Sequence, residues 1–156
     1  MVRVCLFLVI FLLIFLIPDT AQAAPAPNIR ATGGWTETID GSDLQSPWTA
    51  GSNLVNTYES VVNATSLNVI FNSYWRVDIR RSDGNWHGNF TLRARRSGGS
   101  YLEVTPTDAS FFCGYKTSNN VQVQYQLSGM SVNISPATYW TTVVYTIVEI
   151  TAGECP

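Results

Sequence analysis

The sequence contains little charge, one histidine and three cysteines in 156 residues. Charged side chains make up 13% of it and the formal net charge is −2, which argues against a nucleic-acid-binding protein that relies on overall charge. The one histidine, His87, has no second metal-ligating or catalytic residue at a recognisable spacing. We therefore expect a protein that is not an enzyme, with no catalytic residues, no metal site and no cofactor.

The chain also lacks a second long apolar run. The run that it has, residues 4–17, follows a short basic start and is shorter than the roughly 20 residues that cross a bilayer. Ala21 and Ala23 then provide the small side chains that a signal peptidase reads. We expect residues 1–23 to be a secretory signal peptide. The mature protein would be secreted, periplasmic or at the cell surface, with no membrane span after cleavage.

Cysteines are sparse, and Cys5 leaves with the signal peptide. Cys113 and Cys155 remain as an even pair in an oxidising compartment, so a disulfide between them is expected. Closing that loop would stabilise the fold by roughly 4 kcal/mol in the chain-entropy model. The alternatives are two free thiols or a bridge between two chains.

What the mature chain does contain is period-two alternation, interrupted by frequent turn signals and without a helical stripe. Residues 24–32 are rich in Pro, Ala and Asn and are expected to form a flexible leader. Residues 33–156 are enough for a single domain. This pattern predicts an all-β fold, an antiparallel two-sheet sandwich, with an up-and-down barrel as the alternative.

Strands are predicted where apolar and polar residues alternate or β-branched residues dominate. The last predicted strand is the longest, and Thr, Val, Ile and Tyr dominate both of its faces. A turn is predicted at residues 40–43, whose acidic side chains also suggest calcium but are too few for a calcium shell. The predicted strands are residues 35–39, 54–62, 67–71, 75–80, 90–95, 101–104, 110–113, 121–127, 130–134 and 138–150.

Basic residues concentrate in one predicted hairpin. Asp83-Gly84 is a turn signature, because glycine tolerates the positive φ of a tight reversal. Alternation places two arginines on the polar face of the strand before this turn and two on the polar face of the strand after it. The four are Arg76, Arg80, Arg93 and Arg95.

A basic stripe of this kind suits an anionic glycan or another anionic partner. Trp86 lies next to the turn and would supply an aromatic surface for a sugar. The alternative is a solvated outer sheet face on which Asp78 and neighbouring acidic residues screen the charge. These five basic and aromatic residues are the candidate binding residues.

The second half resembles a bacterial secreted pilin domain of the spore coat protein U and fimbrial-subunit type. The residues that carry the resemblance are 134–146, a turn that opens a long Thr/Val strand, and 121–129 before them. The resemblance implies an immunoglobulin-like subunit of a surface filament or coat, assembled with a periplasmic chaperone. Such subunits join by donating an extended strand to a neighbour's sheet. Here the donor would lie in residues 24–39.

The sequence thus favours a secreted structural or adhesive surface protein and, within that class, points to a pilin-like or coat subunit that self-assembles. The competing function is a glycan-binding β-sandwich module that uses the arginine-rich hairpin. Neither function involves nucleic acid.

Overall fold

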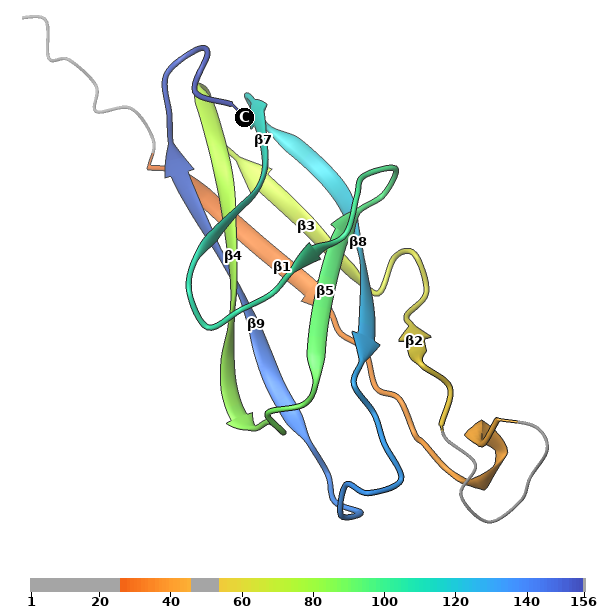
Figure 1. The fold of residues 1–156 in the computed structure, drawn as a ribbon. Coiled ribbons are helices and arrows are strands. Elements are labelled where there is room, and N and C mark those ends of the chain that lie inside the picture. The colour runs from red at the N-terminus through yellow and green to blue at the C-terminus, as the bar shows by residue number, and fades with distance from the viewer. Residues whose placement is uncertain (1–25, 46–53, 156) are drawn as a thin grey trace, which may run out of the picture.

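The structure is a computed structural model that describes residues 26–45 and 54–155 (Figure 1). The predicted signal peptide lies outside the described residues. Within them, the chain forms strands and one short 3-10 helix, η2 (Gly41–Asp43), at the turn predicted for residues 40–43. The prediction of an all-β fold is confirmed.

The strands form two antiparallel sheets, and not one closed barrel. The larger sheet has the order β1-β3-β8-β5-β6, with β2 beside the end of β8. Its strands are β1 (Asn28–Gly33), β2 (Thr57–Glu59), β3 (Thr65–Ile70), β5 (Thr91–Arg96), β6 (Leu102–Glu103) and β8 (Ser118–Ser128). The smaller sheet has the order β7-β4-β9, with β7 (Ala109–Tyr115), β4 (Tyr74–Asn85) and β9 (Trp140–Glu149).

The core lies between the two sheets and is made of alternate residues from each. Trp75 is at its centre, with its ring edge-to-face against Phe112 and its indole N–H donating to the Lys116 carbonyl at 2.6 Å. Burial of each large side chain contributes roughly 1.5–3 kcal/mol to folding. The other buried core residues include Leu67, Val69, Val77, Ile79, Leu92, Ala94, Val104, Val123 and Tyr125.

A chain of hydroxyls connects the two sheets inside this core. Tyr125 on β8 donates to Thr65 Oγ1 on β3 at 2.8 Å, and its hydroxyl oxygen lies 2.7 Å from that of Tyr145 on β9. Burial raises the pKa of both phenols, which keeps them protonated. These hydrogen bonds fix β9 against the larger sheet.

The expected flexible leader is in fact a strand from Asn28 onward. Strand β1 pairs with β3 over its whole length, from Asn28 opposite Ile70 to Gly33 opposite Thr65. Composition did not reveal it, because five of its six residues are exposed and the ladder uses main-chain groups. The sandwich therefore begins at Asn28 and not at residue 33.

Two predicted strands are absent from the described residues. Residues 35–39 have no regular structure, although the Trp35 ring packs against the core and its indole N–H donates to Glu37 at 3.2 Å. Residues 130–134 form a turn, in which the Ile134 amide donates to the Ser131 carbonyl. Apolar side chains at these positions reflect packing and turn formation, not pairing in a sheet.

The predicted hairpin around Asp83-Gly84 is wrong, because the chain does not reverse there. Strand β4 continues to Asn85, paired with β9, and the chain then crosses to β5 in the other sheet (Figure 1). A register shift leaves Gly84 out of the ladder, and its φ is not positive. The six-membered part of the Trp140 ring fills the space that a side chain at residue 84 would need. Gly84 therefore provides room for the Trp140 ring and does not form a turn.

Candidate functional site

The four candidate arginines lie on two different sheets. Arg76 and Arg80 are on β4 in the smaller sheet. Arg93 and Arg95 are on β5 in the larger sheet, where they alternate with buried residues. Both pairs point away from the core, so they face opposite sides of the sandwich. The prediction of one basic stripe across a hairpin is therefore wrong.

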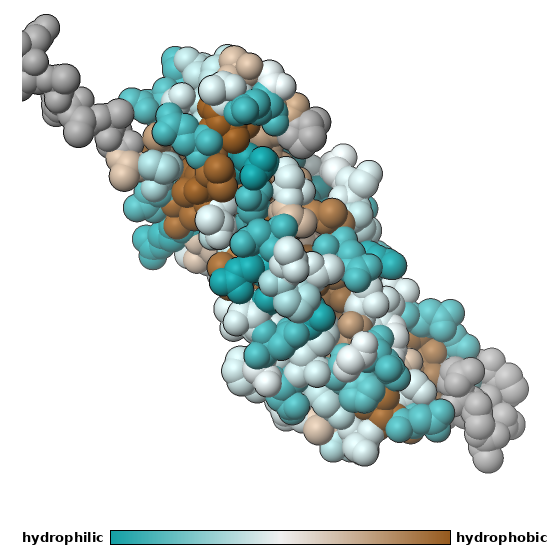
Figure 2. Space-filling model, turned by 60° about the vertical axis from the view of Figure 1, so that its left-hand side comes forward, coloured by the Kyte–Doolittle hydropathy of each residue, from teal (hydrophilic) through white to brown (hydrophobic). Residues whose placement is uncertain are grey.

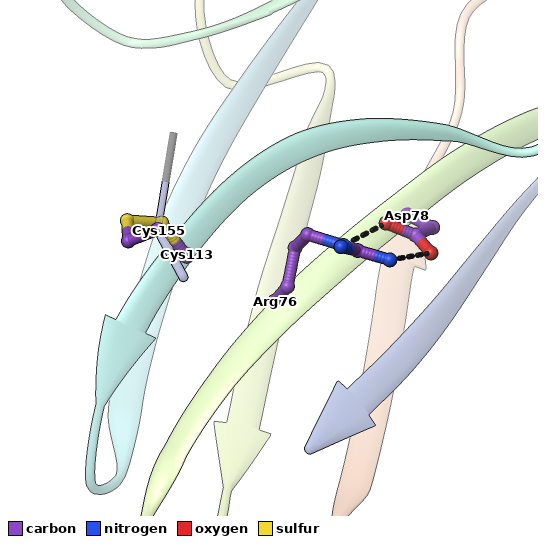
Figure 3. Close-up of a disulfide and its surroundings, with 4 residues drawn as sticks. All are labelled: Arg76, Asp78, Cys113 and Cys155. Carbon is purple, nitrogen blue, oxygen red and sulfur yellow. Dashed lines mark hydrogen bonds and ion pairs between the residues drawn. A yellow bond between two sulfur atoms is a disulfide. The ribbon is translucent and has the colours of Figure 1, made fainter. Parts of the chain in front are cut away.

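The arginines of the smaller sheet are paired with aspartates. The Arg76 guanidinium donates to both oxygens of the nearly buried Asp78, at 2.6 and 3.0 Å (Figure 3). These hydrogen bonds raise the pKa of Arg76. Arg80 lies 3.5 Å from Asp108 in a more exposed pair. The charges on this face are largely compensated, as the alternative of a screened outer face predicts.

The arginines of the larger sheet have neutral partners instead. Arg95 donates twice to Gln124 Oε1, at 3.0 and 2.8 Å, and Arg93 donates to Gln126 Oε1 at 3.4 Å. The Arg95 guanidinium also lies 4.5 Å from the centre of the Tyr101 ring. Both glutamines also donate to Glu59, and Glu103 lies opposite Arg93 in the sheet. Within the described residues neither arginine forms an ion pair, so Arg93 and Arg95 are the better remaining candidates for an anion.

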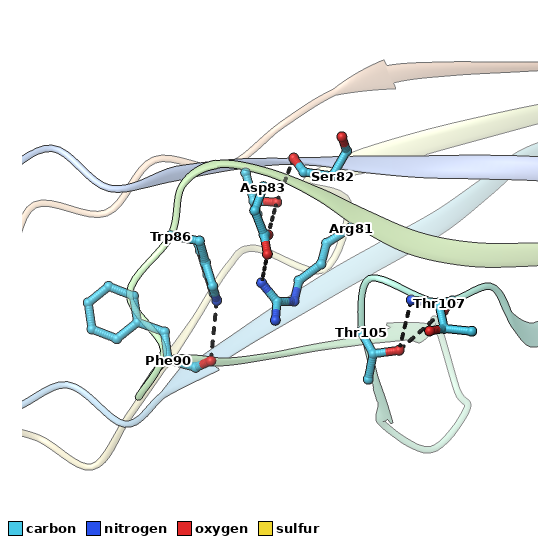
Figure 4. Close-up of polar contacts among 8 residues, drawn as sticks. Arg81, Ser82, Asp83, Trp86, Phe90, Thr105 and Thr107 are labelled. Carbon is cyan, nitrogen blue, oxygen red and sulfur yellow. Dashed lines mark hydrogen bonds and ion pairs between the residues drawn. The ribbon is translucent and has the colours of Figure 1, made fainter.

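Trp86 belongs to the crossover between the sheets and is half-buried. Its indole N–H donates to the Phe90 carbonyl at 3.3 Å, and its ring packs edge-to-face on the Phe90 ring (Figure 4). The guanidinium of Arg81, which is ion-paired with Asp83, lies 5.4 Å from the centre of the indole. The ring is thus enclosed by its neighbours and not a free platform for a sugar. Among the described tryptophans, Trp140 is the exposed one, at 55%.

The other residues with possible chemistry have structural partners. His87 Nδ1 accepts a hydrogen bond from the Asn89 amide, and its ring packs between Phe90 and Tyr139. Asp40 caps η2, and hydrogen bonds from Ser42 lower its pKa. In residues 26–45 and 54–155, no group of three His, Cys, Asp or Glu side chains is placed to hold a metal ion.

The disulfide between Cys113 and Cys155 is present, as predicted (Figure 3). It joins β7 to the turn after β9, with the two Cα atoms 5.9 Å apart. That turn is closed by the Thr151 amide donating to the Glu154 carboxylate at 2.7 Å, a bond that lowers the pKa of Glu154. The bridge therefore anchors the end of the chain on the smaller sheet.

Strand β9 has one open edge. It pairs with β4 along its length, and no described strand is hydrogen-bonded to its other side, although β1 of the larger sheet lies close to it. None of its ten residues is fully buried, although six of them are Val, Ile, Tyr or Trp. No charged residue or proline occurs from Trp140 to Val148. Sequence reasoning noted the apolar character of both faces here but gave no sign that the strand is an edge.

Apolar surface is visible near one end of this edge. Figure 2 shows brown patches close to the point where the grey N-terminal trace leaves the molecule. In Figure 1 that is the end at which β1 begins and β9 ends. Ile29 on β1 and Ile147 on β9 are both only partly buried against the core.

No protein-family model, no curated protein and no solved structure significantly matches this chain. The resemblance to secreted pilin domains thus stays a prediction from the sequence. Among the described residues, no helix is long and apolar enough to cross a membrane.

Proposed function

We propose that this protein is a secreted, non-enzymatic structural subunit of a cell-surface coat or filament, of the pilin-like kind. The observation that carries the proposal is the open edge of β9. A long, uncharged strand edge is a template for pairing with another chain, and monomeric sandwiches usually block such edges with charges, prolines or bulges. Strand β9 has no charge or proline between Trp140 and Val148, and its pairing with β4 is regular from Thr141 to Glu149.

Assembly of this kind does not require the donor segment expected from the sequence. Residues 28–33 of that segment already form β1 in the protein's own sheet. Donating them to a neighbour would require β1 to leave β3 and lose six paired residues. An edge without a hydrogen-bonded partner in the folded subunit supports assembly at a smaller conformational cost.

The proposal is tested on protein that has been exported by its own leader. We expect N-terminal sequencing to begin at Ala24, the protein to co-purify with the surface fraction, and light scattering to detect species larger than a monomer. Protein that stays inside the cell, or that is exported but is absent from the surface fraction, would contradict the proposal.

A second function, binding of an anionic glycan, is favoured by one observation. Arg93 and Arg95 share an outer sheet face, and their direct hydrogen-bond partners are neutral amides and not carboxylates. Replacing both with glutamine should abolish retention on heparin resin. The matched control replaces Arg30 and Arg80 with glutamine, which removes the same charge at other places and should leave retention unchanged. If the wild-type protein is not retained, this function is excluded.

A further inference from the structure

We propose that the open edge of β9 is a self-pairing interface. In this arrangement, two copies join β9 to β9 in antiparallel fashion about a two-fold axis, which merges their three-stranded sheets into one continuous sheet. The inference rests on the proposed structural function and names its partner, a second copy of this chain.

The main chain of β9 is arranged for such pairing. In an antiparallel pair, alternate residues direct their N–H and C=O groups to the neighbouring strand. The Ile150 amide donates to the Tyr74 carbonyl, so the even-numbered residues face β4. Val143, Tyr145 and Ile147 therefore direct their main-chain groups to the open edge.

The same three residues have side chains that pack on the core while staying partly exposed. In such a pair, the core-facing side chains of both copies lie on the same face of the merged sheet. Odd-numbered residues of one β9 therefore lie opposite odd-numbered residues of the other. Val143 then meets Tyr145 or Ile147 of the second copy, depending on the register. Either register covers apolar surface that the isolated subunit leaves half-exposed.

The charge pattern of β9 is also self-complementary. Its one charged residue, Glu149, is at the end of the strand. In an antiparallel pair this end meets the uncharged beginning of the other β9. No like charges therefore lie opposite each other, and threonines and valines fill the middle of the ladder.

The other free edges of the sandwich fit β9 less well. Strand β1 has an arginine, Arg30, in its middle. Strand β7 is irregular, because its register with β4 shifts between the partners of Val77 and Asp78. The disulfide also links it to Cys155. Strands β6 and β2 have only two and three residues. Among the described edge strands, a second β9 therefore matches β9 best in length, charge and regularity of pairing.

The test replaces Thr142 and Thr146 with lysine in the mature protein. Both side chains are exposed and point away from the core, so the subunit should fold normally. Pairing would bring the lysines of the two copies together, and like charges at that position should weaken self-association at least tenfold. The matched control places lysines at Ser97 and Ser100, in the exposed turn after β5, and should associate like the wild type.

The measurement is sedimentation across a concentration series, combined with amide hydrogen exchange. We expect dimers at high concentration, with the amides of Val143, Tyr145 and Ile147 gaining protection as dimers form. Association that the Thr142/Thr146 lysine variant leaves unchanged, or that leaves these amides unprotected, overturns self-pairing through β9. A monomer at every concentration also overturns it. The proposed function fails separately, if the exported protein is absent from the surface fraction.

Discussion

The hydroxyl chain in the core predicts that two similar substitutions have unequal effects. Tyr125 has one hydroxyl proton, which it donates to Thr65, so Tyr145 must donate to Tyr125. Replacing Tyr145 with phenylalanine removes one hydrogen bond and leaves Tyr125 bonded to Thr65. Such a loss costs about 1 kcal/mol. Replacing Tyr125 instead leaves the buried hydroxyl of Tyr145 without a partner and breaks both bonds.

We expect Tyr125→Phe to lower the free energy of unfolding by about 3 kcal/mol, because an unsatisfied buried donor adds its desolvation cost to the lost hydrogen bonds. The double variant should be no less stable than Tyr125→Phe alone, since removing the second hydroxyl removes the unsatisfied donor. Urea unfolding followed by tryptophan fluorescence measures all three values.

The control is Tyr139→Phe, which removes an exposed hydrogen bond to the Ser135 carbonyl and should change stability by less than about 0.5 kcal/mol. The reasoning is refuted if Tyr145→Phe is as destabilising as Tyr125→Phe, or if the two effects simply add. Either result would mean that the two hydroxyls do not act as a directed chain.

Three further predictions follow from the same structure. Burial raises the pKa of both phenols above the ordinary value of 10, so the unfolded chain releases these protons first and the free energy of unfolding should fall as pH rises above about 10. Urea midpoints measured from pH 8 to 11 test this, and a flat profile contradicts it. Cys113→Ser should cost about 4 kcal/mol for a loop spanning 42 residues, and equal stability with and without reductant would contradict that value. Gly84→Ala should cost less than about 1 kcal/mol, because its Cβ meets only the far edge of the exposed Trp140 ring, which can rotate away, and a larger loss in a thermal scan would contradict this.

Local alternation was sufficient to predict the fold class. Trp75, Val77 and Ile79 alternate with polar residues in the sequence, and the structure buries all three. The pairing of Cys113 with Cys155 was predicted from the expected oxidising compartment and from the even number of cysteines left after the predicted signal peptide. These predictions hold because each depends on residues close in the sequence or on the number of cysteines. Neither depends on which strands pair with each other.

Sheet membership could not be predicted in the same way. Alternation assigns Arg80 and Arg93 to polar faces, and both are on outer faces in the structure. Alternation does not say that the chain crosses from one sheet to the other between them. That crossing depends on the pairing of β4 with β9, whose residues are about 60 positions further along the chain. The predicted arginine site was wrong for this reason. Each arginine pair was assigned correctly to an outer face, but the two faces belong to different sheets.

The composition of β9 is the strongest reason to look beyond the single chain. A strand that is apolar on both faces is usually a central strand, covered on each side. In this sandwich it is an edge, and none of its residues is fully buried. Its neighbour β4, which is the central strand of this sheet, buries four residues: Trp75, Val77, Asp78 and Ile79. The apolar content of β9 exceeds what the isolated subunit uses, and covering its open edge with a second copy would account for it.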